Sequence, residues 1–452
     1  MKSKKVHLVL FLLSCLFVSM PALSLNEAID MAKKNNKQFL GQAEDVEMAE
    51  YLYQDVRGML LPQISLNGSV QKSKTYLPDV TQTGFSFNNV TSESNLASTL
   101  DKLLLPGKST EEASIAAQLK AQQVLFSGGK LINGIKVAQK YRNLQKKTYE
   151  LQEEQLVFDI TKAYYELVLL NEVVNIQREA LDLANSHFQR VQNLNENGLV
   201  SEYDLLRADL EVSKLAPALE DIENKFVIAQ TNFKRQIGEL SSDDLVFDDK
   251  LEKVTVPSLT LDEAINNGLE NRIELYLSDL SVEMYQVKHN AEKGNYLPNV
   301  LLTADITKFS STKEFEIKSE NFGTQYSAGI VFQIPLFTGM SNNAKIQQTK
   351  HELKKAELGN MDAKDLIKLE ITNNWQSLQT AVQQLNVQEK NIKTAEKGYE
   401  IANERYENNI GIQLEILDAQ TQLNGAKVSY IQALYQLNIA VNSFNKSIGT
   451  KL

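Results

Sequence analysis

The sequence has little of the chemistry that most enzymes depend on. Its 452 residues include one cysteine, one tryptophan and four histidines. The cysteine, Cys15, lies in the N-terminal 24 residues, so the rest of the chain can form no intramolecular disulfide and offers no thiolate. No two of His187, His289 and His351 have the spacing of metal ligands on one helix. No Ser/His/Asp or paired-carboxylate motif is present either, so the sequence predicts no enzyme, no cofactor and no metal site.

Positive charge is also scarce, because 47 Lys and Arg face 57 Asp and Glu, a formal net charge of -10. An acidic chain without a dense basic patch is a poor nucleic-acid binder. Residues 106–110, Pro-Gly-Lys-Ser-Thr, resemble the end of a phosphate-binding loop, but Lys102 stands where the first glycine of that loop belongs. The sequence therefore predicts neither a nucleic-acid partner nor a nucleotide site.

Long apolar runs are absent beyond the N-terminus. Lys2, Lys4 and Lys5 precede an apolar run over 6–18, which is typical of a secretory leader, and residues 1–24 are predicted to be a signal peptide cleaved after Ser24. A second possibility stays open, since residues 12–15 loosely resemble a lipoprotein box that would lead to acylation of Cys15. No later stretch approaches the roughly 20 apolar residues of a membrane-spanning helix. The chain is expected to be exported.

The chain contains an internal duplication in two fixed registers. Leu61-Pro62 recurs 236 positions later as Leu297-Pro298, and Leu125-Phe126 recurs 211 positions later as Leu336-Phe337. The offsets differ by 25, so the first copy carries 25 additional residues, predicted to form a surface loop within 77–111. We predict a first repeat over 25–240, a linker over 241–260 and a second repeat over 261–452.

Each repeat contains two segments in which apolar and polar residues alternate, the pattern of a strand with one apolar face. The predicted strands lie at about 63–76, 113–126, 299–310 and 324–336. A half-buried soluble sheet would explain the alternation. Strand lengths of about 9 to 11 residues and a polar second face also match a membrane strand that borders a water-filled lumen. Four strands cannot close such a lumen, so oligomerisation is predicted to complete a shared barrel.

The rest of each repeat is predicted to be helical. Lys130 to Asn197 and Ser341 to Asn408 are proline-free stretches of about 68 residues, or roughly 100 Å of helix each. Asn and Gly then interrupt each stretch, at about 195–203 and 408–414, and the chain returns through a second helix. These breaks are predicted to be the tips of two helical hairpins.

In this order, the motifs resemble those of the TolC-like outer-membrane efflux proteins over essentially the whole exported chain. The motifs that carry the resemblance are Leu25-Asn26-Glu27-Ala28-Ile29, Leu61-Pro62, Leu125-Phe126-Ser127-Gly128-Gly129, Asn197-Gly198-Leu199-Val200-Ser201, Arg405-Tyr406-Glu407 and Leu417-Asp418-Ala419-Gln420. The resemblance implies a mainly α fold with membrane β: duplicated helix-strand-strand-helix units, and a trimeric twelve-stranded barrel continued by an α-helical periplasmic tunnel. It also implies a homotrimer in outer-membrane lipid, with a periplasmic adaptor and an inner-membrane transporter as partners.

The resemblance also assigns roles to residues near the hairpin tips. Glu415 and Asp418 fall on an acidic ring at the periplasmic aperture, although two acids on a polar helix are by themselves typical of a solvated face. Tyr406 and Asp204 fall on gate contacts, but the arginine of that gate is replaced by Gly411, so Tyr203 is considered as another gate contact. The residues assigned to adaptor docking, which are otherwise ordinary turn residues, are Gly198, Leu199, Val200, Ser201, Asn409, Ile410 and Gly411.

The function implied is that of a channel subunit that exports small molecules or proteins, from the periplasm or through a tripartite pump. The sequence does not distinguish drug, protein and metal export. A soluble periplasmic scaffold or adaptor is the alternative. It would explain the leader and the hairpins, but not two matched pairs of alternating strands.

Overall fold

The computed structural model describes residues 23–76, 109–239, 250–408 and 410–450. The chain divides into two compact units, one made of Met1–Glu47, Leu144–Asp279 and Leu358–Leu452, the other of Met48–Asn143 and Leu280–Glu357. Each unit takes part of both sequence repeats, so the units do not coincide with the repeats. The leader to residue 22 with Cys15, the insertion over 77–108, Asn409 and residues 241–249 of the predicted linker lie outside the described residues.

Each repeat opens with a short helix followed by a longer one. These are α1 (Leu25–Asn35) and α2 (Lys37–Gly58), then α6 (Leu261–Asn271) and α7 (Ile273–Lys293), which leads into the 3-10 turn η3 (Gly294–Tyr296). Ser24 and Glu27 form a capping box at α1, in which the Ser24 hydroxyl accepts from the Glu27 N–H and the Glu27 carboxylate accepts from the Ser24 N–H at 3.0 Å. Thr260 and Glu263 do the same at α6. Both first helices therefore begin where a side chain replaces the missing intrahelical partner.

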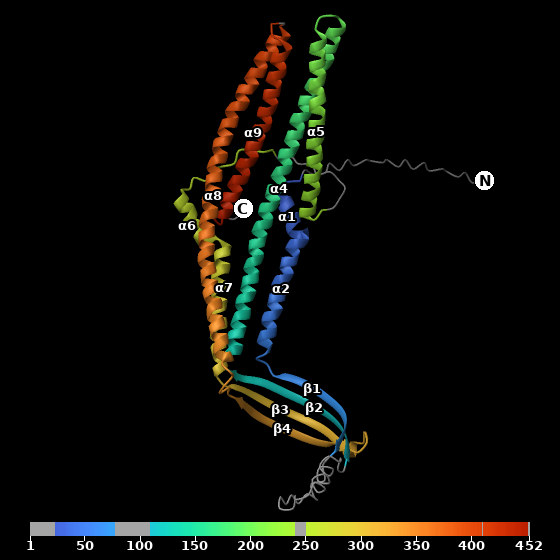
Figure 1. The fold of residues 1–452 in the computed structure, drawn as a ribbon, viewed down its shortest axis with the longest axis vertical. Coiled ribbons are helices and arrows are strands. Elements are labelled where there is room, and N and C mark those ends of the chain that lie inside the picture. Colours follow the sequence, from blue (N-terminus) through green and yellow to red (C-terminus); the bar gives the residue numbers. More distant parts are fainter. Residues whose placement is uncertain (1–22, 77–108, 240–249, 409, 451–452) are drawn as a thin grey trace, which may run out of the picture. The chain divides into compact units, whose positions relative to one another are not determined.

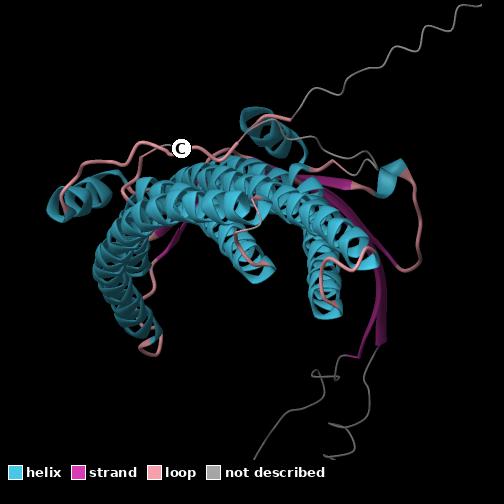
Figure 2. Cartoon of the chain, turned by 90° about the horizontal axis from the view of Figure 1, so that it is seen from above, coloured by secondary structure: helices cyan, strands magenta, loops and turns pink. Residues whose placement is uncertain are grey.

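Two helical hairpins form the largest part of the chain. The first joins α4 (Lys130–Glu196) to α5 (Glu202–Ile237), and the second joins α8 (Ser341–Glu407) to α9 (Gln413–Ser447). Helices α4 and α8 have 67 residues each, one fewer than the predicted stretches. Within the first unit, Figure 2 shows the helices of the two hairpins in a curved layer.

The core of the first unit is built from matching residues of the two repeats. Ile160 and Ile371, related by 211 positions, are both fully buried, as are Phe233 and Phe444. Two helix-borne aromatic side chains also reach matching backbone carbonyls that precede the first helices. The Tyr164 hydroxyl donates to the Leu23 carbonyl at 2.9 Å, and the Trp375 indole N–H donates to the Leu259 carbonyl at 3.4 Å.

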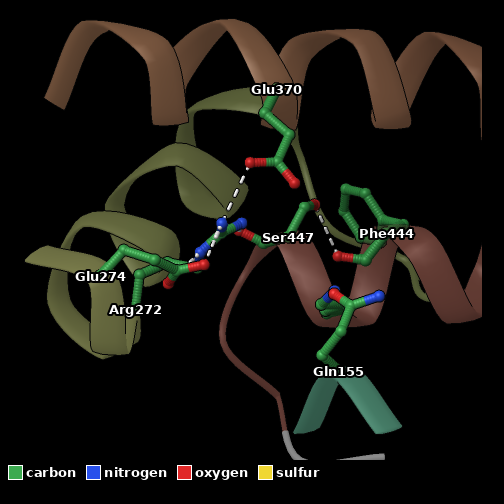
Figure 3. Close-up of polar contacts among 7 residues, drawn as sticks. Gln155, Arg272, Glu274, Glu370, Phe444 and Ser447 are labelled. Carbon is green, nitrogen blue, oxygen red and sulfur yellow. Dashed lines mark hydrogen bonds and ion pairs between the residues drawn. The ribbon is translucent and has the colours of Figure 1, made fainter. Parts of the chain in front are cut away.

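Another matching contact changes its chemistry between repeats. Asn36 donates to the carbonyl of Gln236 at 2.8 Å, near the end of α5. Its counterpart Arg272 donates to the carbonyl of Ser447 at 3.2 Å, at the end of α9, and its guanidinium also pairs with two carboxylates (Figure 3). These are Glu274 at 2.6 Å and Glu370 at 3.0 Å. A cation suits this position, because the carbonyl end of a helix carries partial negative charge.

The second unit contains one antiparallel sheet of four neighbouring strands (Figure 1). Its strands are β1 (Gln63–Tyr76), β2 (Ser109–Ser127), β3 (Asn299–Thr312) and β4 (Gly323–Gln333), with the 3-10 turn η4 (Ser319–Asn321) before β4. Strand β2 begins four residues before the predicted start, because it stays paired with β1 as far as Ser109. Strand β4 ends three residues before the predicted end. Pro335 lies two residues after this end and has no N–H to donate to a ladder.

The two faces of this sheet differ in polarity. One row across the four strands consists of Leu66, Leu119, Ile306 and Tyr326, and Leu66 and Tyr326 are 76% and 74% exposed. The neighbouring row, on the opposite face, is polar and consists of Ser65, Lys120, Asp305 and Ser327. Among the described residues, the apolar face of the sheet is therefore left without cover. None of the helices in the described ranges combines the length and the apolar character needed to cross a membrane.

The capping geometry generates a prediction about export. Cleavage after Ser24 would remove both the α1 cap and the carbonyl that accepts from Tyr164, whereas the equivalent Thr260 and Leu259 are internal to the chain. We therefore expect the exported chain to retain Leu23 and Ser24, in contrast to the cleavage position indicated by the sequence. The intact mass of the purified protein measures this directly.

A matched pair of variants tests how much each N-cap side chain contributes to the free energy of unfolding. Ser24→Ala and Thr260→Ala should each lower the free energy of unfolding by about 1 kcal/mol, the usual contribution of an N-cap side chain. A mass that places the N-terminus at Leu25, or an effect of Thr260→Ala alone, would contradict the expectation.

Candidate functional site at the helical hairpin tips

The first hairpin tip is a glycine-terminated helix end followed by a capped helix start. Gly198 has a φ of 71°, and its N–H donates to the Asn195 carbonyl at 2.8 Å. Ser201 then caps α5, since its hydroxyl donates to the Asp204 carboxylate at 2.6 Å and accepts from the Asp204 N–H at 3.2 Å. Between them Leu199 is 70% exposed. The turn is held by its own hydrogen bonds and leaves an apolar side chain in solvent.

The second tip is closed by different contacts. The N–H groups of Ile410 and Gly411 both donate to the Arg405 carbonyl at 2.9 Å. A Cβ atom at Gly411 would lie only 3.1 Å from Cβ of Arg405, so the backbone of the tip is drawn against α8. Ile410 is 72% exposed, and Ile412 is also exposed. This tip therefore presents apolar side chains as well.

The two hairpins meet through a small set of side chains. The Gln413 amide on α9 donates to the backbone carbonyl of Asp204 on α5 at 3.1 Å. The Tyr406 ring on α8 stacks on His187 of α4, with centroids 5.6 Å apart and an interplanar angle of 29°. The guanidinium of Arg190, one turn along α4, lies 5.6 Å from the same ring. These contacts hold each hairpin against the other near its tip.

The structure distributes the predicted gate residues differently from the sequence hypothesis. Tyr406 does join the hairpins, but through His187 and Arg190. The Asp204 carboxylate is bonded to Ser201 of its own hairpin, and only its backbone carbonyl reaches the second one. Tyr203 is exposed and its ring faces Arg207 of its own helix at 5.6 Å. A side chain at position 411 would need a small shift of the adjacent end of α8, because a Cβ atom there would lie 3.1 Å from Cβ of Arg405 and 3.2 Å from the Tyr406 nitrogen.

The two predicted aperture acids lie on α9 directly after the second tip. Both are exposed, and their i, i+3 spacing places them on one face of the helix. The Glu415 carboxylate pairs with the Arg405 guanidinium at 3.4 Å, so it is partly compensated within the chain. The carboxylate of Asp418 has no such pair among the described residues.

His187 is the functional candidate that the sequence analysis set aside. Its side chain is 9% exposed, and neither ring nitrogen has a hydrogen-bond partner among the described residues. Burial, and secondarily the charge of Arg190, lower the pKa of His187. Burial also raises the pKa of Tyr406. Where the two tips pack together, the His187 imidazole and the Tyr406 phenol are therefore both favoured in their neutral forms.

Sequence patterns carried little information about these contacts. Arg405 and Tyr406 belong to a motif that the resemblance uses, but His187, Arg190 and Gln413 have no motif of their own. Within the described residues there is no group of three or more metal-ligating side chains in reach of one ion.

The chain matches the family model of the outer membrane efflux proteins over residues 28–239 and 264–450. It is 20% identical to the outer membrane efflux protein BepC of Brucella suis, in an alignment that covers 92% of this chain and 83% of BepC. It is 21% identical to the outer membrane protein TolC of Salmonella enteritidis, over 94% of this chain and 82% of that protein.

Solved structures share the fold over nearly the whole chain. The CmeC outer membrane channel of Campylobacter jejuni matches with a TM-score of 0.76 and 17% identity, over 94% of this chain and 85% of CmeC. The outer-membrane channel OprN matches with a TM-score of 0.75 and 16% identity, over 94% of this chain and 89% of OprN. The predicted fold class is confirmed by these matches.

The tip geometry predicts a pH dependence of hairpin contact. The pKa of His187 is lower in the folded chain than in the unfolded chain, so protonation favours separation of the tips. The stabilisation is fully present above about pH 6.5 and is lost as the pH falls below that value. After correction for intrinsic rates, amide hydrogen exchange at 405–413 should be faster at pH 5.5 than at pH 7.5.

His187→Phe is the matched control. It keeps an aromatic ring on Tyr406 and removes the titrating group, so exchange in this variant should no longer depend on pH. Equal protection of the wild-type tips at both pH values would show that His187 does not control their contact.

Proposed function

Because this chain belongs to the outer membrane efflux protein family, we propose that three copies form a channel in the outer membrane, whose helical part extends into the periplasm. The channel exports small molecules or proteins, and a partner inner-membrane transporter supplies the energy. The proteins of this family are outer-membrane channels and not enzymes.

The observation that carries the proposal is the four-stranded sheet. Its apolar rows are exposed on one face and its polar rows line the other, as in a strand wall between lipid and water. Its order, β1-β2-β3-β4, leaves β1 and β4 as open edges in a single chain. Open edges are not tolerated in lipid, because their backbone groups find no hydrogen-bond partner there. Three copies would close a twelve-stranded wall.

The helices support the same assembly. Exposed apolar side chains follow α5 and α8 within the first unit, where the helices lie in a curved layer (Figure 2). They are Leu206, Leu210, Val227 and Ile228 on α5, and Leu358, Met361, Leu366 and Leu369 on α8. Apolar surface on this scale normally faces a partner. Further copies of the curved layer would cover it and enclose a tunnel.

The hairpin tips are proposed to form the periplasmic entrance and to dock a periplasmic adaptor. Leu199, Ile410 and Ile412 are exposed on turns held in place by internal hydrogen bonds. Rigid turns that display apolar side chains lose little conformational entropy on binding. Ile412 is added here to the docking residues that the resemblance assigns. Those residues are Gly198, Leu199, Val200, Ser201, Asn409, Ile410 and Gly411, of which Asn409 lies outside the described residues.

Glu415 and Asp418 are proposed to form the acidic aperture. Threefold repetition would place six carboxylates around the axis, which favours cations over anions. The Arg405–Glu415 pair reduces the contribution of one carboxylate in each chain.

Membrane fractionation followed by planar-bilayer recording tests the function. We expect trimers in the outer membrane that conduct with a preference for cations. The double variant Glu415→Gln, Asp418→Asn should lose that preference, measured as a reversal potential close to zero in a salt gradient. Glu400→Gln serves as the control, because its carboxylate pairs with Lys397 on α8. A soluble protein without conductance would overturn the channel and favour a periplasmic scaffold.

The polarity of the sheet faces allows a sharper test of membrane insertion. Leu119 and Gln118 are neighbours on β2 whose side chains point to opposite faces. Leu119→Arg would place a charge against lipid at a cost of about 2–4 kcal/mol near the midplane, whereas Gln118→Arg would face the lumen. We expect a strong loss of outer-membrane trimer for the first variant only. Equal assembly of both would contradict the proposed lipid face.

A further inference from the structure

The sequence duplication relates the strands of the two repeats with no shift in register. In the first repeat, Leu66 of β1 lies opposite Leu119 of β2. Adding 236 to the β1 residue and 211 to the β2 residue gives Leu302 and Ile330, which lie opposite one another in β3 and β4. The same conversion turns the pair of Ile64 and Ala121 into the observed pair of Val300 and Phe332. The strand pair β1–β2 and the strand pair β3–β4 are therefore equivalent residue by residue.

The pairing of β2 with β3 is the junction between a first and a second repeat. In this junction Leu119 lies opposite Ile306, and Gln118 lies opposite Thr307. Where a second repeat meets the first repeat of another copy, β4 takes the place of β2, and β1 takes the place of β3. The offsets then convert Leu119 and Ile306 into Ile330 and Val70.

A contact between two glycines marks the same junction at the end of the sheet. Gly128 has a φ of 63°, and a Cβ atom there would lie 2.3 Å from the carbonyl oxygen of Gly294. A Cβ atom at Gly294 would lie 2.2 Å from the carbonyl oxygen of Gly128. Only hydrogen on both α-carbons allows the two backbones to approach so closely.

The counterparts of these glycines are Gly339 and Gly58, and a Cβ atom at either would meet no described residue within 4 Å. Gly339 has a φ of 61°, and this left-handed conformation explains why glycine occupies the position. Gly58 is the last residue of α2, and neither a positive φ nor a close contact among the described residues requires glycine there. Glycine at position 58 would be explained if Gly339 of another copy packs against Gly58, as Gly128 packs against Gly294 within the chain.

We propose that β4 of one copy pairs antiparallel with β1 of the next, with Ile330 opposite Val70, and that Gly339 packs against Gly58 across the same junction. The inference rests on the proposed trimer and specifies its interface. The occupant of both open edges is a second copy of this chain. The residues of the junction lie in the unit that contains the sheet.

Cysteine pairs test the register, because the sequence has no cysteine apart from Cys15. The variant Val70→Cys, Ile330→Cys should give disulfide-linked dimers and trimers on oxidation in isolated outer membranes. The controls are Val70→Cys with Ala328→Cys or with Phe332→Cys, which shift the pair by two residues on the same sheet face. Diagonal neighbours are about 7–8 Å apart, whereas a disulfide needs Cβ atoms within about 3.5–4.5 Å. The controls should therefore remain largely uncrosslinked.

The outcomes separate the interface from the function. Preferential crosslinking of a shifted pair, or no crosslinking in protein that is trimeric by light scattering, would overturn the proposed register and leave the channel intact. Monomers without conductance in the wild-type protein would overturn the proposed function itself.

The glycine contact has its own matched test within α2. Gly58→Ala should reduce the yield of trimer several-fold, since its methyl group would meet a backbone carbonyl of the next copy. Gly41→Ala is the control, because Gly41 also lies in α2 with nothing within 4 Å of a Cβ atom, and its counterpart in the second repeat is Leu277. Normal trimer from Gly58→Ala would overturn the proposed glycine contact.

Discussion

The need to pair every backbone N–H and C=O group of a strand in lipid is the constraint on which the rest of this structure depends. A sheet of four strands with one exposed apolar face cannot meet it alone, because two edges stay open. Repetition solves the problem at two levels. Inside the chain, β2 and β3 join the two repeats, and the same geometry is available again at the outer edges. Each repeat also contains one pair of long helices, α4 with α5 and α8 with α9, so the helices are repeated in the same way as the strand pairs.

The duplication preserves backbone acceptors more strictly than side-chain chemistry. Tyr164 and Trp375 share neither a hydroxyl nor an indole, yet both donate to the carbonyl two residues before a first helix. Asn36 and Arg272 likewise reach the carbonyls of Gln236 and Ser447. A buried carbonyl must find a donor, and any side chain that delivers an N–H or O–H to the same point fulfils the need.

Local patterns were sufficient to predict the strands and the long helices, because each has a periodicity that extends over many residues. Boundaries were harder to predict where a local pattern competes with a specific contact. Strand β4 ends at Gln333, before Pro335, although the predicted strand extends to 336. Ser24 caps α1 and also resembles the end of a leader, so the cleavage position stays a prediction. The contacts between the hairpin tips were harder still to predict from the sequence. His187 and Gln413 matter because of residues on the other hairpin, and no spacing within either segment records that proximity.

The contacts between the tips are individually weak, and this has a mechanical consequence. An aromatic stack contributes about 0.5–1.5 kcal/mol, and a hydrogen bond such as that from Gln413 contributes about the same. The Asp204 carboxylate, which could have formed a charged bridge between the hairpins, caps its own helix instead. Separation of one pair of tips therefore costs about 1–3 kcal/mol for these two contacts, less than the roughly 5.5 kcal/mol of differential binding that reverses a 1:99 equilibrium. In the proposed channel, a partner that prefers separated tips would hold them apart through binding alone, without a chemical step in this chain.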